Sequence, residues 1–347
     1  MPFNHYDKKL FQKALERAHD EGRRIVAPLV GFPGLNMTGS TIKLAQQDYG
    51  KHYRAMKAIA EVFQPDVQFP LMDLSVEANA LGRYTLFPTE DSATVIKEEF
   101  SLDELPRKRE IDIVFDTRLI GNVETVRMMG IGLPSSIMKG AYVIGPYSLA
   151  GLIMGADDAA MATIMEPEKL HTLVEFTTER IQEYVRLLIS SGAQVVCILE
   201  PSAVMLGPDQ FEEFSSNYVA HIVRSYAYTG VATVYHTCGN TMYLVEKMAE
   251  SGVDGLSLDS PEAGVDLPAI VRRIPKEVAL IGNLNPTGSI LRGLTQDVKK
   301  DVAELLNQME HCTNFVLSTG CDLPQETPLE NIGAFMEAGR AYRLPSN

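Results

Sequence analysis

The sequence has no apolar stretch long enough to cross a bilayer, and its first nine residues lack the apolar h-region of a secretory signal. It also has no GxGxxG or GxxxxGKS/T phosphate cradle, no internal repeat and no low-complexity tract. These absences argue against a membrane protein, a nucleotide cofactor and a repeat protein. We therefore expect a cytoplasmic protein with no membrane partner.

Basic residues and cysteines are also scarce. The chain has 31 Lys and Arg against 45 Asp and Glu, a net charge of -14, whereas nucleic-acid binding needs clustered basic side chains. Nucleic acid is therefore not an expected partner. Four cysteines in 347 residues are too few for a disulfide scaffold, so each is expected to be a free thiol, a small buried side chain or a metal ligand.

What the sequence does contain is an alternation of short apolar, β-branched runs with longer helical patterns. This alternation is typical of βαβ units and a parallel sheet, and eight such runs indicate a closed (β/α)8 barrel, the TIM barrel of the α/β class. Because no flexible linker interrupts the pattern, we expect one domain over residues 1–347. The expected strands cover residues 25–30, 67–72, 142–145, 194–199, 232–235, 255–258, 278–282 and 315–318.

The helical patterns are most regular in the second half of the chain. Pro167 opens the longest pattern, with acidic residues beside it, as a helix amino terminus favours. The segment between the second and third strands, residues 74–139, is too long for one crossover. Alternation at 95–100 and a helical pattern at 120–129 predict an elaboration there, a β-hairpin with extra helices. Further helices are expected at 208–228, 243–251, 267–274, 295–310 and 328–342.

Polar side chains follow almost every expected strand at its carboxyl end. In barrels of this kind the chemistry lies on the loops after those ends. We therefore expect these side chains to meet at one rim, although loops are polar in general. The residues concerned are Asp73, Glu200, His236, Cys238, Asp259, Asn283, Asn285 and Cys321.

His236 and Cys238 stand two residues apart where the fifth expected strand ends, so in an extended chain their side chains point the same way. With Cys321 they supply one nitrogen and two sulfurs, the ligand set of a zinc site that keeps an open position. A hydrogen-bonded loop histidine with two inert thiols fits the same spacing. The spacing by itself leaves both interpretations open.

Four more rim residues are candidates for the site. Glu200 directly follows a buried strand, so it is either a displaceable fourth ligand or proton-handling group, or an acid that tethers a loop. Asp73 is a second catalytic candidate. Asp259 and Asn285 are candidates for orienting a ligand, and holding their own loops is the alternative for both.

Four motifs carry a family resemblance. Residues 73–82 read DLSVEANALG, residues 142–150 read YVIGPYSLA, residues 236–239 read HTCG and residues 318–321 read STGC. Together they resemble the uroporphyrinogen decarboxylase superfamily, and within it the zinc-dependent methyltransferases of corrinoid systems. The resemblance extends over nearly the whole chain, and the His-x-Cys motif with a distant Gly-Cys pair is specific to the methyltransferase branch.

The resemblance implies a TIM barrel with Zn²⁺ at its carboxyl end, held by His236, Cys238 and Cys321. It also implies a separate corrinoid protein as partner, which carries the cobalamin, and a small-molecule methyl donor or acceptor. The decarboxylase branch carries an arginine-rich amino-terminal motif that binds the carboxylates of the porphyrinogen. The corresponding residues 27–36 contain no arginine, which puts tetrapyrrole decarboxylation in doubt.

Two methyltransferase activities follow from the resemblance. One demethylates a methoxylated aromatic and passes the methyl group to Co(I) of a corrinoid protein. The other moves a methyl group from a corrinoid protein to the thiol of coenzyme M. We favour the first, because the loop at residues 31–40 differs from that of the coenzyme M enzymes and Phe32, Met37 and Met72 offer apolar walls for an aromatic ring.

Two further expectations complete this interpretation. Glu200→Gln is expected to retain zinc but to lose turnover, because Glu200 would be a resting ligand or an acid near the leaving oxygen. From a different class of function, the alternative is a non-catalytic barrel that binds a corrinoid or another small ligand around a structural zinc. Structural zinc sites are usually closed by four protein ligands, whereas catalytic sites keep an exchangeable position.

Overall fold

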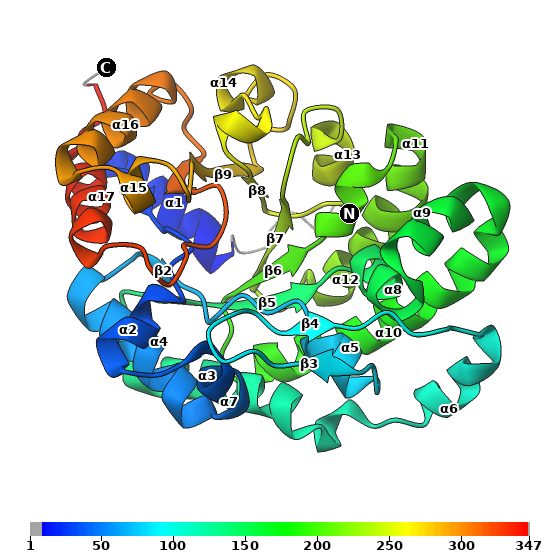
Figure 1. Ribbon diagram of the computed structural model, residues 1–347. Helices are drawn as coiled ribbons and strands as arrows, with labels where there is room; N and C mark the ends of the chain where they lie inside the picture. The colour runs from blue at the N-terminus through cyan, green and yellow to red at the C-terminus, as the bar shows by residue number, and fades with distance from the viewer. Residues whose placement is uncertain (1–8, 346–347) are drawn as a thin grey trace.

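The computed structural model describes residues 9–345, and eight of its strands form one parallel sheet that curves into a barrel with helices around it (Figure 1). This is the (β/α)8 barrel predicted from the sequence. The order of the strands around the barrel is β1 (Ile25–Val26), β10 (Phe315–Thr319), β9 (Ala279–Leu284), β8 (Gly255–Leu258), β7 (Ala232–Thr237), β6 (Val195–Leu199), β5 (Met138–Ile144) and β2 (Val67–Gln68).

The strands are apolar along their whole length because they are covered on both faces. Every residue of β5, β6 and β7 is buried, as expected of parallel strands between a filled barrel and a layer of helices. Alternate residues face inward and fill the barrel, among them Phe69, Tyr142, Cys197, Val234 and Val316. The barrel is therefore a packed core, and its polar residues are confined to the ends of the strands.

The eight strands lie where the sequence predicts them, but several have different ends. β5 begins at Met138, four residues before the predicted start at residue 142. β1 and β2 are two residues each, although six were predicted for each run. These two short strands are at opposite ends of the strand order, so the hydrogen-bonded ladder of the described residues does not close between them.

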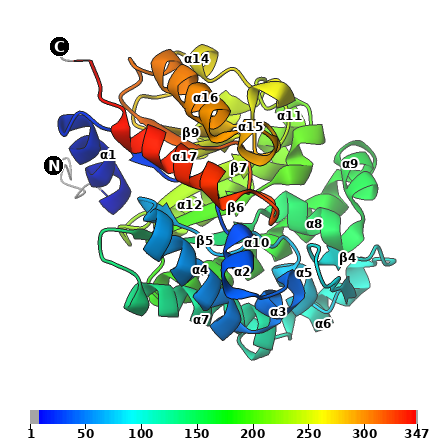
Figure 2. The same cartoon turned by 60° about the vertical axis from the view of Figure 1, so that its left-hand side comes forward.

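The helices cover the outside of the barrel. α17 packs beside α16 and against β1 (Figure 2). The bounds are α1 (Leu10–Asp20), α2 (Pro33–Thr38), α3 (Ile42–Gln47), α4 (Tyr49–Phe63), α5 (Val76–Ala80), α6 (Leu105–Arg109), α7 (Thr117–Gly132), α8 (Pro146–Met154), α9 (Ala156–Met165), α10 (Pro167–Ser190), α11 (Pro208–Phe211), α12 (Asn217–Tyr226), α13 (Val245–Glu250), α14 (Leu267–Ile270), α15 (Ser289–Arg292), α16 (Thr295–Gln308) and α17 (Leu329–Ala341).

One predicted helix is interrupted in the structure. The pattern at residues 208–228 predicts a continuous helix, but α11 and α12 are separated by a π-helical turn at Glu212–Ser216. A π-turn widens the helix locally and changes the direction of the side chains that follow. Ser215 lies in this turn and is fully buried, and its hydroxyl donates to the carboxylate of Glu200, which directly follows β6.

The predicted elaboration between the second and third barrel strands is present. Its hairpin consists of the antiparallel strands β3 (Thr85–Leu86) and β4 (Thr94–Val95), which are shorter than the strand predicted at 95–100. The predicted helix at 120–129 is part of the longer α7, and α6 follows the hairpin. Short 3-10 helices at Leu102–Glu104 and Ile113–Phe115 complete the segment.

Within residues 9–345 no single helix is both long enough and apolar enough to span a membrane. α8 and α9 together reach that length and composition, but the chain bends by 107° between them.

Candidate metal centre

The end of β7 brings an imidazole and a thiol to the rim of the barrel. His236 is only 1% exposed, and its Nε2 lies 3.3 Å from Sγ of Cys238. The two-residue spacing therefore places both side chains on one side of the chain, as the sequence predicts. Gly239 follows with a φ of 83°, a conformation that favours glycine, and the chain turns away from the strand there.

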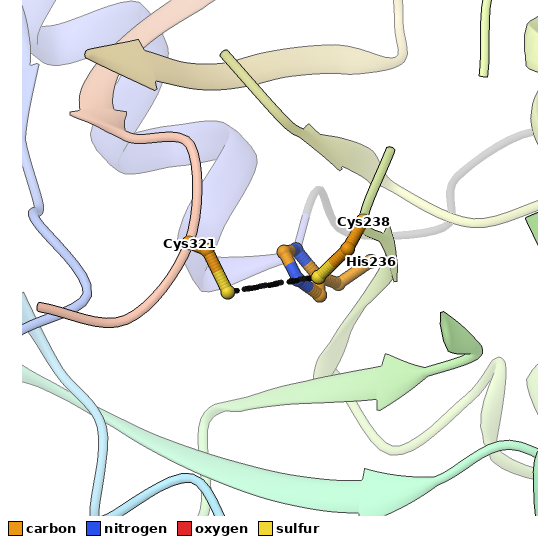
Figure 3. A group of neighbouring side chains, drawn as sticks. All are labelled: His236, Cys238 and Cys321. Atoms are coloured by element: carbon orange, nitrogen blue, oxygen red, sulfur yellow. Dashed lines mark hydrogen bonds between the residues drawn. The ribbon is translucent and has the colours of Figure 1, made fainter. Parts of the chain in front are cut away.

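Cys321 reaches the same point from a different part of the sheet. β8 and β9 lie between β7 and β10, yet Sγ of Cys321 is 3.6 Å from Sγ of Cys238 and 3.9 Å from Nε2 of His236. The three ligand atoms all lie within 4.8 Å of one another (Figure 3). We refer to His236, Cys238 and Cys321 as the ligand triad.

The dimensions of the ligand triad fit a tetrahedral zinc ion. Nitrogen and sulfur ligands at about 2.0 to 2.3 Å from a tetrahedral ion lie about 3.5 to 3.8 Å from each other. The three observed separations, 3.3, 3.6 and 3.9 Å, bracket that range. One imidazole and two thiols also suit zinc better than magnesium or calcium, which prefer oxygen ligands. The residues present therefore fit the ion that the family resemblance implies.

Ser257 on the neighbouring strand orients the imidazole. β7 and β8 pair with His236 opposite Ser257, and the Ser257 hydroxyl lies 3.0 Å from Nδ1 of His236. When this hydroxyl accepts a hydrogen bond from Nδ1, Nε2 is the nitrogen with a free lone pair. That nitrogen faces the two thiols. Sequence analysis missed Ser257, although a serine within the apolar run Gly255–Leu258 is an available signal.

The two thiols are coupled through one hydrogen bond. The bond from Cys321 lowers the pKa of Cys238, and the same bond, together with burial, raises the pKa of Cys321 well above its usual value. Without a metal ion, Cys238 is thus the thiol that gives up its proton more readily, and Cys321 is the one that keeps it. Because metal ligands must be deprotonated, binding of an ion to the triad would release that proton.

Glu200 is not part of this group. Its side chain is fully buried, and its two carboxylate oxygens accept hydrogen bonds from the amides of Tyr147 (3.0 Å) and Ser148 (2.8 Å) and from the hydroxyl of Ser215 (3.1 Å). Tyr147 and Ser148 belong to the first turn of α8, where backbone amides have no partner within the helix. The geometry thus gives no support to Glu200 as a fourth metal ligand and fits its alternative role as a tether.

The surroundings of Glu200 are built for a carboxylate. Burial raises its pKa to about 7, while hydrogen bonds from Ser148, Tyr147 and Ser215 act in the opposite direction. A side chain at Gly145 would place its Cβ 2.1 Å from Cγ of Glu200, so only glycine leaves room for the carboxylate. The Gly-Pro-Tyr-Ser sequence that begins α8 was available as a signal. The contact between Gly145 and Glu200, 55 positions later, has no such signal in the sequence.

The two cofactor-binding candidates hold loops beside the triad or near it. Asp259 accepts hydrogen bonds from the amide of Gly239 (2.7 Å) and from its neighbour Ser260 (2.6 Å), so it fastens the turn directly after Cys238. Asn285 accepts from the amide (2.9 Å) and hydroxyl (3.1 Å) of Thr287 and stabilises its own turn. Neither side chain belongs to the ligand triad.

Asp73 is held by an ion pair near the end of β2. It contacts the guanidinium of Arg118 and accepts hydrogen bonds from the amide (2.9 Å) and hydroxyl (2.7 Å) of Ser75. Both charged side chains are almost fully buried, at 6% and 7% exposure. Arg118 also lies over the ring of Phe87, which follows the hairpin strand β3, at 4.8 Å. This arrangement fixes Asp73 and the hairpin to α7.

The structure also shows polar groups that sequence analysis did not select. Asp322, next to Cys321, accepts hydrogen bonds from the amides of Gly31 and Met72, and burial raises its pKa to about 7. Of the apolar walls predicted around the site, Met72 is partly buried between the barrel interior and the neighbouring cluster in which Phe32 is buried, and Met37 is partly buried against the main core.

Comparison with known proteins finds matches to one family model and to two kinds of relative. The family model described as uroporphyrinogen decarboxylase (URO-D) matches residues 36–342. A uroporphyrinogen decarboxylase from Prochlorococcus marinus is 24% identical over 319 residues, which cover 89% of this chain and 87% of that protein. A methylcobamide:CoM methyltransferase, MtbA, from Methanosarcina mazei is 26% identical over 277 residues, which cover 78% of each chain.

A solved structure of a methyltransferase from Methanosarcina mazei superposes with a TM-score of 0.82 at 20% sequence identity, covering 96% of this chain and 98% of that one. This similarity shows that the two chains share a fold over nearly their whole lengths.

Proposed function

The chain belongs to the uroporphyrinogen decarboxylase family, and from that premise we propose that it is a zinc-dependent methyltransferase of a corrinoid system. Its partners are a corrinoid protein and a small-molecule methyl donor or acceptor. The substrate favoured here is a methoxylated aromatic, whose methyl group passes to Co(I) of the corrinoid protein.

The ligand triad is the observation that carries this proposal. His236, Cys238 and Cys321 converge at the carboxyl end of the barrel, with distances that suit one zinc ion. Glu200, the acid predicted as a fourth ligand, is instead engaged by the first turn of α8. Three protein ligands leave a tetrahedral ion one exchangeable position, as catalytic zinc sites have. Methyl transfer needs such a position for the oxygen or sulfur of the substrate.

Zinc in the triad would supply a Lewis acid for an ether oxygen, or a site that holds a thiol as thiolate at neutral pH. Two neighbouring residues orient the ligands of that site. Ser257 directs the free lone pair of His236 towards the thiols, and Asp259 holds the turn after Cys238. Below the rim, the stacked rings of Phe69 and Tyr142 fill the barrel, with centroids 4.8 Å apart, and exclude water from that side.

In the favoured direction, the bond between the methyl carbon and the ether oxygen breaks, and its electron pair stays on the oxygen as a phenolate. Co(I) provides the electron pair of the new cobalt–carbon bond, and the phenolate takes its proton from solvent. Met72, which packs beside the barrel interior, is the apolar side chain that supports an aromatic substrate.

A second candidate is transfer of a methyl group from a corrinoid protein to a thiol. Its specific support is the similarity to MtbA, which is named a methylcobamide:CoM methyltransferase. A thiol would use the same triad as an ether oxygen, so the two candidates differ in what enters the open position and in the direction of transfer.

One assay separates these candidates. The protein is loaded with zinc and incubated with cob(I)alamin and a panel of methoxylated phenols, and separately with methylcobalamin and a panel of thiols. Methylcobalamin is measured by its absorption spectrum. The proposal predicts that methylcobalamin forms only when a methoxylated phenol is present. Consumption of methylcobalamin with thiols, without the first reaction, would establish the second candidate instead.

Two cysteine variants serve as controls for the assay. Cys238→Ser removes a triad ligand and should abolish transfer in either direction. Cys312→Ser removes a buried thiol that contacts Asn314 (3.0 Å) and lies outside the triad, and it should leave transfer unchanged. Absence of transfer in both directions with the wild-type protein, despite bound zinc, would instead support a non-catalytic barrel.

A further inference from the structure

The barrel of the described residues has one seam, between β1 and β2, where the strand ladder does not close. Side chains bridge this seam in place of a continuous ladder. At its lower end, Asp66 accepts a hydrogen bond from the amide of Val26 (2.8 Å), and the Asp66 amide donates to the Val26 carbonyl (3.0 Å). Further up, Nε2 of Gln68 donates to the carbonyl of Val30 (3.2 Å).

Asp322 bridges the upper end of the same seam. One of its carboxylate oxygens accepts a hydrogen bond from the amide of Gly31, after β1 (3.3 Å), and the other accepts from the amide of Met72, after β2 (3.4 Å). The next amide in the chain, that of Leu323, donates to the carbonyl of Leu29 (2.9 Å). A single carboxylate thus connects the ends of two strands that do not pair with each other.

The position of Asp322 matters because it directly follows a member of the ligand triad. His236 and Cys238 are set by β7, whereas Cys321 is on a loop beyond the end of β10, the strand that pairs with β1 beside the seam. On its other side this loop is packed tightly. The amide of Gly320 donates to the carbonyl of Leu284 (2.8 Å), and a Cβ at Gly320 would lie 2.7 Å from the amide nitrogen of Ser260.

We infer that Asp322 is a positioning residue for the metal centre, because its carboxylate holds the Cys321 loop to the ends of β1 and β2 and so sets the distance from Cys321 to the other two ligands. This inference rests on the proposed zinc site.

The matched test compares Asp322→Asn with Asp66→Asn. Both changes remove a carboxylate that bridges the same seam, but only Asp322 lies beside a triad ligand. Zinc affinity is measured by competition with a chromophoric chelator, and the Co²⁺-substituted proteins are examined for the sulfur-to-cobalt charge-transfer band. The thermal stability of each metal-free protein is measured in parallel, because it reports on the fold without the metal centre. Asp66 also pairs with Arg23 (3.3 Å), and its variant loses that ion pair as well.

Asp322→Asn should raise the zinc Kd by about 10- to 100-fold, the usual effect of losing a group that orients a metal ligand, and should weaken the charge-transfer band. Asp66→Asn should lower the thermal stability of the metal-free protein while its zinc Kd stays within about threefold of wild type. If Asp322→Asn does not fold, Asp322→Glu, which keeps the charge but displaces the carboxylate, is measured in its place with the same expectation.

The inference is overturned if both variants lose similar thermal stability while Asp322→Asn, or its replacement, binds zinc as tightly as wild type. Asp322 would then only close the seam. That result would leave zinc binding and methyl transfer by the wild-type protein intact, so it is distinct from failure of the proposed function. A wild-type protein that binds no zinc would overturn both.

Discussion

Glu200 and His236 end neighbouring strands, and the amide of Glu200 donates a hydrogen bond to the carbonyl of His236 (2.9 Å), but their side chains meet opposite surroundings. The carboxylate of Glu200 receives hydrogen bonds from two amides of α8 and from the hydroxyl of Ser215. The imidazole of His236 contacts the hydroxyl of Ser257 through Nδ1 and the two thiols through Nε2.

This difference defines two kinds of polar site. We call Glu200 with its hydrogen-bond donors the closed site and the ligand triad the open site. Burial of a carboxylate is costly unless hydrogen bonds replace the water it loses, and the chain supplies those donors to Glu200 itself. Imidazole and thiol side chains are less costly to bury than a carboxylate, so they need fewer partners within the chain. We therefore expect the closed site to stabilise the fold and the open site to take an ion and a substrate.

Removal of a triad ligand should have the largest effect on the open site. Cys321→Ser should lower methyl transfer by at least about 10³-fold, because a metal site with two protein ligands no longer holds zinc in place. Zinc content after dialysis should fall well below one ion per chain. The measurement is metal analysis together with the methyl-transfer assay, with Cys312→Ser as the matched cysteine control. Full activity in Cys321→Ser would contradict the role of the triad.

Ser257→Ala should have a smaller effect on the same site. The variant keeps all three ligands but loses the hydrogen bond at Nδ1 of His236, so the zinc Kd should rise by about tenfold. Chelator competition measures the change, and Ser257→Thr, which keeps the hydroxyl, is the control. An unchanged zinc Kd in Ser257→Ala would mean that the imidazole is oriented by other contacts.

Glu200→Gln should affect the closed site and spare the open one. The amide group of glutamine would direct its hydrogens at one of the two amide donors of α8, and the variant should lose about 1 to 3 kcal/mol of unfolding free energy. Urea unfolding of the metal-free protein measures this loss. Zinc affinity and methyl transfer should stay within about threefold of wild type. Loss of turnover in a stably folded variant would instead restore the proton-handling role suggested by sequence.

Glu77 is a second buried acid that is hydrogen-bonded within the chain. Its titration should affect the pH dependence of folding stability and not zinc binding. Burial, with a smaller contribution from Asp73, raises its pKa from 4.5 to about 8, while a hydrogen bond from the Ile144 amide and the charge of Arg118 oppose the shift. Between these two pH values the folded chain keeps a proton on Glu77 that the unfolded chain has lost. Stability from this group therefore falls as pH rises through the window, by at most about 1.4 kcal/mol per pH unit.

Glu77→Gln tests this dependence, because glutamine does not titrate and can still accept from the Ile144 amide (2.8 Å). Relative to wild type, the variant should gain unfolding free energy as the pH is raised from 6 to 8, with no change in zinc affinity. Parallel curves for the two proteins over this range would show that Glu77 is not the group responsible.

The open site was easier to predict from sequence than the closed one for a physical reason. His236 and Cys238 are local, since the alternation of side chains along a strand determines their direction, and Cys321 follows another recognisable strand. Their meeting in space follows from the barrel. The partners of Glu200 depend on where α8 begins and on a π-helical turn that directs Ser215 inward, and neither can be inferred from periodicity.

The ends of β1 and β2 show a similar limit. The apolar runs at residues 25–30 and 67–72 predict two long strands, but hydrogen bonding by Asp66, Gln68 and Asp322 replaces most of the ladder between them. Such contacts join residues up to 291 positions apart, as between Gly31 and Asp322. The division of the chain into a single domain over residues 1–347 stays a prediction.

The most direct test of the open site is X-ray absorption at the zinc edge of the purified protein, with and without a methoxylated aromatic substrate. We expect two sulfur ligands, one imidazole and one further light atom, and we expect that light atom to change when the substrate is added. A shell of four protein ligands that is the same in both samples would contradict a catalytic zinc. Absence of zinc from a protein supplied with the ion would contradict the metal centre itself.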